Sequence, residues 1–401
     1  MTTTGPALAE IQGLYGPFSF AEKLLQKIWL RGDFNRAAAV TNDGRVIQLK
    51  FAGKWNLLGG PDFRGARLRF DHGAEVTGDV ELHLRAGDWD AHGHARDLAY
   101  RDVVLHVVLF PPDRGRLTRG YQGQEIPILA LLPLLHHDLE EFAADEAVDI
   151  LASRPLAGLP EDLAALSASE LQKSLREHAA RRWQMKTHFA RLRLRRLGWE
   201  EACHHAALEV LGYRYNRSAM LRVAGRWPLA AWTCGVPRAD EAFAAEQGNW
   251  SLQGMRPANF PRQRLRQYEK WTTVRPDWPL RWMSTRFPEV TSDPRSTREI
   301  REELGFTSLR RRVAEDVLGD ALGGSRLHTL ICDGLLPLLA VQHPQEVSLH
   351  EIWFHWFVGD FPATLLVNLR QLGVFEVRTQ PTCHGLAQGL LGWRLAREVR
   401  H

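Results

Sequence analysis

Cysteine is scarce and scattered in this sequence. Its four cysteines, Cys203, Cys234, Cys332 and Cys383, lie far apart in 401 residues, and no two of them form a C-x-x-C pair. A chain of this length buries enough apolar surface to fold without disulfide bonds. We therefore expect free thiols and a protein of the reducing cytoplasm.

Long apolar runs are also missing. Residues 1–10 contain neither a basic region nor an apolar stretch of the kind found in secretory signals. The most apolar segments, Ile126–Leu135 and Leu330–Val341, are interrupted by proline or aspartate. Both are well short of the roughly 20 residues that span a bilayer. We expect no membrane partner.

Neither sign of charge dominates. Lysine and arginine total 51 against 47 acidic residues, which leaves a net charge of +4 and only a slight preference for a polyanionic partner such as DNA or RNA. The 44% hydrophobic content and 14 tryptophans exclude a disordered chain. The length favours two domains.

The first third of the chain has strand-length apolar segments. Ser19 and Glu22 have capping-box spacing, and the apolar residues that follow predict a helix that ends at Gly32. Apolar alternation or short apolar runs then predict four strands. These strands are Val46–Phe51, Ala66–Phe70, Val76–Leu84 and Val103–Phe110.

From His136 onward the apolar periodicity is helical. The longest predicted helices cover Asp162–Arg196, Glu200–Leu211, Arg295–Leu318 and Ser348–Leu372. We therefore predict an α+β protein with a nuclease-like mixed sheet flanked by helices over residues 1–134. A mainly helical domain with a basic surface would follow over residues 135–401.

The candidate site lies between Asp62 and His106. Asp62 opens one strand at a turn, and Glu81 and His83 share the polar face of the next strand because side chains alternate at period two. If the two strands pair antiparallel, Asp62 and Glu81 converge on one divalent cation. Carboxylate ligands favour Mg²⁺ or Mn²⁺. The alternatives are a turn carboxylate at Asp62 and a solvated strand face at Glu81 and His83.

Two further histidines follow in a polar connection. His92 and His94 are candidates for proton transfer, and with His83 they form the predicted catalytic set. They are alternatively polar loop residues. His106 interrupts an apolar strand, which favours a hydrogen-bonded core histidine over a ligand.

This arrangement resembles the PD-(D/E)-x-K nuclease pattern, in which an acid opening one strand and an acid-x-lysine on the next share a metal ion. The predicted order of helix, three strands, connection and strand is typical of that superfamily's core. His83 stands where the lysine belongs. A neutral imidazole ligates metal or orients water but lacks the fixed charge of lysine.

Longer segments resemble an uncharacterised bacterial family, domain of unknown function 2851. The similarity covers most of the chain and implies no reaction. The matching segments are Gly60–Phe63, Gly78–His83, Asp88–Trp89, His92–His94, Val103–Val108, Leu211–Asn216 and Met255–Pro261.

Basic residues gather in the helical half. Residues 170–197 hold nine lysines or arginines against two acids, beside an apolar stripe that allows one side to pack while the other faces phosphate. The alternative is a solvated basic face. The predicted contacts to nucleic acid are Arg181, Arg182, Lys186, Arg193, Arg256 and Arg264.

Three functions follow from these patterns. The first is a metal-dependent nuclease or phosphodiesterase, with Asp62 and Glu81 as ligands and His83 positioning water or ligating. The second is a nucleic-acid-binding protein without catalysis, built on a degenerate nuclease core. The third is a histidine-rich metalloenzyme that acts on a small molecule.

Overall fold

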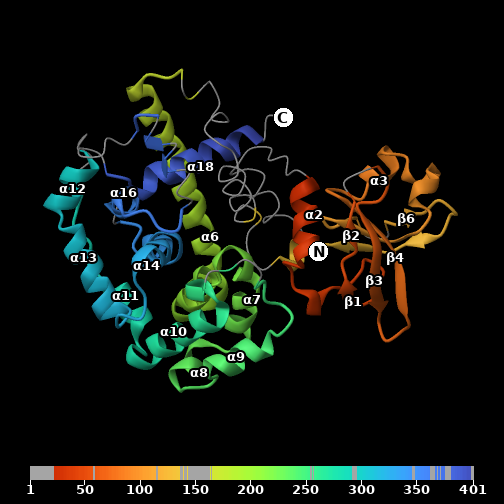
Figure 1. Ribbon diagram of the computed structural model, residues 1–401, viewed down its shortest axis with the longest axis horizontal. Coiled ribbons are helices and arrows are strands. Elements are labelled where there is room, and N and C mark those ends of the chain that lie inside the picture. Colours follow the sequence, from red (N-terminus) through yellow and green to blue (C-terminus); the bar gives the residue numbers. More distant parts are fainter. Residues whose placement is uncertain are drawn as a thin grey trace. The chain divides into compact units, whose positions relative to one another are not determined.

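The computed structural model describes residues 22–56, 59–113, 116–135, 139, 142, 163, 165–252, 255, 257–290, 296–345, 348–361, 366–367, 369–370, 372–374 and 381–398. The chain divides into two compact units, Met1–Glu146 and Ala147–His401 (Figure 1). Unit 1 carries the sheet, and unit 2 is mostly helical, so the predicted α+β class is confirmed.

Helix α2 (Glu22–Arg31) begins unit 1. Its apolar residues Leu24, Leu25, Ile28 and Trp29 recur at helical spacing, and all four are buried. Gly32 adopts a positive φ of 63°, a conformation that glycine takes without strain, and ends the helix as predicted. The proposed cap Ser19 lies outside the described residues.

Unit 1 is built on a six-stranded mixed sheet in the order β1-β3-β4-β5-β8, with β2 paired to β3. Strand β3 pairs antiparallel with β1 and β4, whereas β5 pairs parallel with β4 and β8. The strands are β1 (Ile47–Phe51), β2 (Lys54–Trp55), β3 (Phe63–Phe70), β4 (Glu75–His83), β5 (Val103–Val108) and β8 (Ile128–Ala130).

The four predicted strands all form, with ends shifted by a few residues. The short strands were not predicted, since two or three residues carry no periodicity. Besides β2 and β8 they are β6 (Thr118–Arg119) and β7 (Glu125–Ile126), which form a separate two-stranded sheet. Short 3-10 turns lie at η1 (Arg36–Ala38) and η4 (Leu132–Leu134).

The parallel pairing of β4 and β5 requires a crossover connection. The chain leaves β4 through α3 (Asp88–Ala91), η2 (His94–Arg96) and η3 (Leu98–Tyr100) before it returns as β5. Figure 1 shows α2 at one side of the strands and α3 at the other. The crossover carries the predicted histidines back toward the strand that they follow.

The two faces of the sheet differ in chemistry. The main core of unit 1 joins α2 to one face of the sheet and includes Leu25, Trp29, Leu68, Leu82 and Leu105. Because side chains alternate along a strand, Glu81 and His83, which flank Leu82, face the opposite side. That side is covered by the crossover and by β6, so it is a buried polar face.

Unit 2 consists of helices and short helical segments. It includes the 3-10 turn η6 (Pro257–Asn259) and the π-helical segments η7 (Val313–Val317) and η8 (Leu330–Leu335). The described α-helices are α6 (Ala168–Leu211), α7 (Tyr213–Arg226), α8 (Leu229–Thr233), α9 (Ala239–Ala245), α10 (Pro261–Val274), α11 (Trp278–Met283), α12 (Thr297–Glu303), α13 (Phe306–Arg312), α14 (Gly324–Thr329), α15 (Leu336–Gln342), α16 (Ser348–His355) and α18 (His384–Glu398).

Helix α6 covers most of both helices predicted before Gly212, but it begins at Ala168, and residues 165–167, which were predicted to be helical, are not. Ser167 and Glu170 form a capping box at its start, and Gly198 interrupts the helix with φ 74° and ψ 177°. The predicted break between the two segments is therefore present as a kink inside α6. Its predicted start at Asp162 lies outside the described residues.

Two other predicted helices are shorter than expected. The segment predicted as Arg295–Leu318 is divided at Gly305, where φ is 62°, into α12 and α13, followed by η7. The segment predicted as Ser348–Leu372 is helical as α16 to His355, is not helical over residues 356–361, and is helical again at residues 366–367 and 369–370. Gly359 lies in the segment where the prediction failed, and glycine is a weak helix former.

Two expectations about the chain as a whole can be compared with the structure. All four cysteines are unpaired, with Cys203, Cys332 and Cys383 buried and Cys234 exposed. Across the described residues, no helix combines the length and apolar character needed to cross a membrane. The domain boundary near residue 134 and the cytoplasmic location stay predictions.

Candidate metal centre

Glu81 and His83 form the floor of the candidate site. Strand β4 presents both on its buried polar face, with relative exposures of 6% and 1%, so the alternative of a solvated strand face is wrong. In the parallel register Glu81 lies beside His106 of β5, which is fully buried. The predicted core role of His106 is confirmed.

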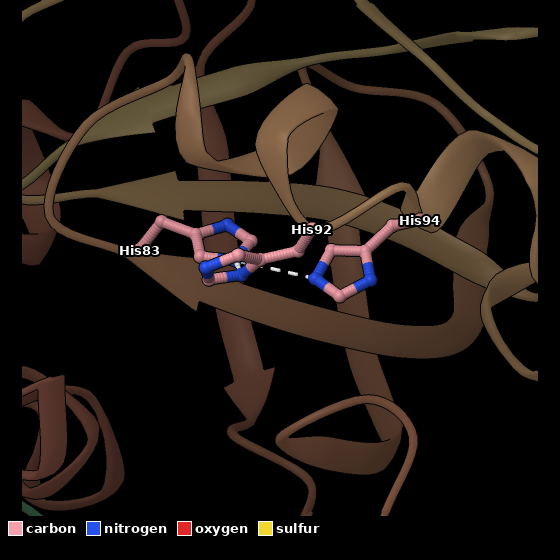
Figure 2. Close-up of side chains that lie close together, drawn as sticks. All are labelled: His83, His92 and His94. Atoms are coloured by element: carbon pink, nitrogen blue, oxygen red, sulfur yellow. Dashed lines mark hydrogen bonds between the residues drawn. The ribbon is translucent and has the colours of Figure 1, made fainter.

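His92 and His94 approach from the crossover. His92 caps the C-terminal end of α3 and is exposed, Gly93 takes a positive φ of 74°, and His94 begins η2 and is buried. The left-handed glycine between them turns the chain so that both rings face His83. Figure 2 shows the three rings gathered around one point, although they come from two different segments.

The facing nitrogen atoms are close enough to share one ion. His83 Nε2 lies 3.1 Å from His92 Nδ1 and 3.3 Å from His94 Nε2 (Figure 2), and one nitrogen from each ring lies within 4.8 Å of the other two. Glu81 Oε1 lies 3.6 Å from His83 Nε2 and 3.4 Å from His94 Nε2.

These separations match the shape of a metal site. In a tetrahedral centre with metal–nitrogen distances of about 2.1 Å, neighbouring ligand atoms lie about 3.4 Å apart. His83 Nε2 lies 3.1–3.3 Å from the nitrogens of His92 and His94, and Glu81 Oε1 lies 3.4–3.6 Å from His94 and His83. The three histidine nitrogens therefore have the spacing of ligands to one metal ion, and Glu81 lies beside two of them.

The electrostatics of the site favour neutral imidazoles. Burial, together with the neighbouring histidines, lowers the pKa of His83 to about 3. Burial, reinforced by His92, lowers the pKa of His94 to about 4. Both rings are thus deprotonated at neutral pH, the state in which a histidine nitrogen binds metal.

Glu81 has the opposite shift. Burial and the nearby carboxylate of Asp62 raise the pKa of Glu81 to about 9. At neutral pH this carboxyl group holds a proton unless a cation takes the proton's place. Binding of one metal ion would therefore release one proton from Glu81.

Asp62 supports Glu81 through its backbone. Its N–H donates to Glu81 Oε2 at 2.9 Å, while its own carboxylate accepts from Leu82 N at 3.0 Å and from Gln26 Nε2 at 2.6 Å. Asp62 and Glu81 converge as predicted. The Asp62 N–H fixes one oxygen of Glu81, and both residues lie outside the three-histidine group, so a metal-binding role for Asp62 stays a prediction.

Several supporting residues were not identified from the sequence. Gln26 of α2 joins Asp62 to Trp55 Nε1, which donates to Gln26 Oε1 at 3.1 Å. Thr118 of β6 is hydrogen-bonded to His106. Gln26 lies between apolar positions of α2, and Thr118 lies beyond the last predicted strand, so neither carried a sequence signal.

Aromatic rings enclose the histidines. Tyr100 stacks on His94 with ring centroids 3.8 Å apart, and Trp89 contacts His94 edge-on at 5.2 Å. Both aromatic residues are buried. The exposed ring of His92 therefore marks the side on which solvent reaches the centre.

The predicted nucleic-acid contacts do not form an exposed basic face. Arg182, Lys186 and Arg264 are 4%, 7% and 8% exposed. Arg182 donates to Gln388, Lys186 pairs with Asp333 at 3.0 Å, and Arg264 donates to Gln267 and Asn259. These side chains pack in unit 2 because buried charges require such partners.

The remaining predicted contacts have different surroundings. Arg193 forms an ion pair with Glu209, and Arg181 is exposed. Arg256 lies outside the described residues. Among the other basic residues of α6, Lys173, Arg176, Arg191, Arg195 and Arg196 are also exposed, so the helix combines internal pairing with a solvent-exposed basic side.

Fold and site together define an α+β protein with a histidine-rich candidate metal centre. The chain belongs to the family Protein of unknown function (DUF2851), whose model matches residues 22–235, more than half of the chain. The match includes the whole candidate centre. No curated protein and no solved structure matches the chain.

Proposed function

We propose that this protein is a metal-dependent hydrolase that cleaves phosphodiesters, with His83, His92 and His94 as the ligands of one transition-metal ion and Glu81 beside the position left open for water. The observation that carries the proposal is the group of three histidine nitrogens within 4.8 Å of one another, with Glu81 Oε1 3.4–3.6 Å from two of them. Three imidazoles and one carboxylate suit Mn²⁺, Zn²⁺ or Fe²⁺ better than Mg²⁺.

A bound ion would supply a water of lowered pKa and an electrophile for the phosphoryl oxygen. The protein residues prepare that chemistry. Burial keeps His83 and His94 neutral, and the Asp62 N–H orients Glu81 by binding its other oxygen. His92 lies at the exposed edge, where a substrate would reach the ion.

The strand arrangement supports the choice of a phosphodiester. An acid precedes β3, an acid-x-histidine ends the antiparallel neighbour β4, and a crossover leads to a parallel β5. This is the order expected of the PD-(D/E)-x-K nuclease core, with His83 in the position of lysine. The positive charge that lysine would contribute would then come from the metal ion.

Metal analysis and hydrolysis assays test the proposal together. The purified chain is stripped with a chelator, reloaded with Mn²⁺, Zn²⁺ or Mg²⁺, and assayed on bis(p-nitrophenyl) phosphate, DNA and RNA. We expect one tightly bound transition metal per chain and metal-dependent cleavage. His92→Gln should lose metal and activity, and Glu81→Gln should bind metal more weakly and lose activity.

A matched control is available in the same unit. His72 is also exposed but lies at the turn between β3 and β4, outside the candidate centre, so His72→Gln should retain both metal and activity. Cleavage that continues unchanged in Glu81→Gln, or a chain that binds no metal, would contradict the proposal.

The burial of Arg182, Lys186 and Arg264 favours a second candidate, a histidine-rich metalloenzyme that acts on a small molecule. The same metal centre would operate, but without these three predicted contacts to the phosphates of a long polyanion. One bound metal, hydrolysis of small phosphodiesters or other esters, and no response to DNA or RNA would favour this candidate.

A further inference from the structure

We propose that His106 and Thr118 are positioning residues for the metal centre, which hold His83 as the tautomer that leaves Nε2 free for the ion. This inference rests on the proposed metal binding and extends it by two residues that do not touch the ion. His83 Nδ1 lies 3.0 Å from His106 Nε2, and His106 Nδ1 lies 2.8 Å from Thr118 Oγ1.

The three side chains form a buried, linear series of hydrogen bonds from His83 through His106 to Thr118. Their exposures are 1% for His83, 0% for His106 and 2% for Thr118. No solvent-exposed group interrupts the chain, which crosses from β4 to β5 and then to β6. In this environment each unpaired polar atom would be costly, so the direction of every hydrogen bond matters.

Proton counting fixes that direction once an ion is bound. A neutral imidazole carries one N–H, and an ion at His83 Nε2 leaves the proton on Nδ1. His83 Nδ1–H must then donate to His106 Nε2, and the proton of His106 must lie on Nδ1. That N–H donates to Thr118 Oγ1, so one arrangement satisfies all three residues.

The chemistry of the last residue is informative. A metal-binding histidine commonly donates its second N–H to a carboxylate, a carbonyl or water. Here the chain ends at a hydroxyl, which accepts the hydrogen bond without adding negative charge. A carboxylate in the place of Thr118 would lie in the same buried region as Glu81 and Asp62, which already oppose each other's ionisation. The ion would therefore keep more of its positive charge for substrate.

The experiment uses the full chain and Zn²⁺, which is diamagnetic. Thr118→Val removes the hydroxyl while it keeps the shape of the side chain, and Thr118→Ser restores it. We expect the Zn²⁺ dissociation constant, measured by competition with a chelator, to rise by about 10- to 100-fold in Thr118→Val. Thr118→Ser should recover wild-type affinity.

A spectroscopic measurement separates positioning from general loss of packing. Histidine ¹⁵N–¹H spectra of the Zn²⁺-loaded protein should place the proton on Nδ1 in both His83 and His106. Thr118→Val should weaken that preference in His106, and urea denaturation of the metal-free variant should show that it is folded.

The possible results distinguish this inference from the proposed function. Weakened Zn²⁺ binding in Thr118→Val without any hydrolysis by the wild type supports the positioning role and overturns the hydrolase. Equal Zn²⁺ affinity in wild type and Thr118→Val, or an Nε2 proton on His106 in the loaded protein, overturns the positioning role alone. A wild-type chain that binds no Zn²⁺ overturns both.

Discussion

Asp62 and Glu81 are joined by a hydrogen bond that runs from backbone to side chain. The N–H of Asp62 donates to Glu81 Oε2 at 2.9 Å, and the other oxygen of Glu81 faces the histidine nitrogens. The bond orients Glu81, while the carboxylate of Asp62 raises its pKa. Asp62 therefore both orients Glu81 and favours its neutral form, and Glu81 lies 3.4–3.6 Å from two of the three histidines.

This relationship predicts how metal binding depends on pH. The pKa of Glu81 is raised to about 9, so the ion must displace one proton below that pH, whereas His83 and His94 are already neutral. Between pH 7 and 8.5 the Mn²⁺ dissociation constant should fall about tenfold for each unit of rising pH. Glu81→Gln should bind more weakly and lose this slope. A wild-type affinity that is independent of pH would contradict the prediction.

A second prediction concerns the stability of the metal-free protein. Asp62→Ala leaves Leu82 N–H and Gln26 Nε2 without their acceptor, which should lower the free energy of unfolding by about 1–3 kcal/mol. Asp62→Asn keeps one oxygen as an acceptor for Leu82 N–H, so it should lower the free energy of unfolding by less than Asp62→Ala does. Chemical denaturation in the presence of a chelator measures both variants. Equal stability of wild type and Asp62→Ala would show that these hydrogen bonds contribute nothing.

A third prediction concerns metal removal. An ion that binds only the folded state should raise the free energy of unfolding, by about 2.7 kcal/mol when its concentration is 100 times the dissociation constant. Addition of a chelator should reverse the increase. His92→Gln should abolish the effect, while His72→Gln should preserve it. A thermal or denaturant midpoint that does not respond to metal would count against the centre.

The basic residues of α6 provide a fourth prediction. Lys186 is 7% exposed and its ammonium lies 3.0 Å from Asp333 Oδ1, so Lys186→Met removes a buried cation from beside that carboxylate and should lower the free energy of unfolding by about 3 kcal/mol. Arg181→Met, on the exposed side of the same helix, should change stability by less than about 0.5 kcal/mol. Denaturation curves compare the two. Equal effects would refute the internal role of Lys186.

A fifth prediction concerns acid sensitivity in unit 2. Burial lowers the pKa of His204 to about 3, and its Nε2 donates to the carbonyl of Trp227 at 3.0 Å. Below about pH 6.5 the unfolded chain takes up a proton at His204 that the folded chain does not. The contribution of neutral His204 to the free energy of unfolding is therefore fully present above that pH and is lost as pH falls toward 3. Over this range the free energy of unfolding should fall by about 1.4 kcal/mol per pH unit because of His204. His204→Asn should remove that part of the slope in urea titrations at pH 4.5–6.5.

Strand periodicity located the site because it is a local property. The alternation around Leu82 placed Glu81 and His83 on one face, and the turn at Asp62 gave the pairing that brings the two acids together. Both follow from neighbours in sequence. Whether the polar face is exposed to solvent or buried depends on the crossover segment between β4 and β5. The periodicity of β4 itself carries no information about that burial.

The ligand set could not be predicted in the same way. His92 and His94 face His83 because β5 pairs parallel with β4 and because Gly93 adopts a positive φ. The first is a tertiary choice of strand direction, and the second is a single backbone angle. The hydrogen bond that Asp62 accepts from Gln26 could not be predicted from the sequence either, because the two residues lie 36 positions apart.

Charge was the least reliable guide. A run of lysines and arginines indicates a basic surface only if the side chains face solvent. Lys186 and Arg182 instead face partners contributed by η8 and α18, about 150 to 200 residues further along the chain. Such partners cannot be identified from the helix alone.

The three histidines lie within twelve consecutive residues, from 83 to 94. An ion bound by all three closes loops of only about ten residues, and loop closure costs little entropy at that length. If the proposed ion binds, the unfolded chain would hold a weak form of the same site, and the ion would raise the free energy of unfolding by less than one that binds only the native state. During synthesis the segment would be complete before β5 emerges, so the proposed ion would have a site before the sheet is finished.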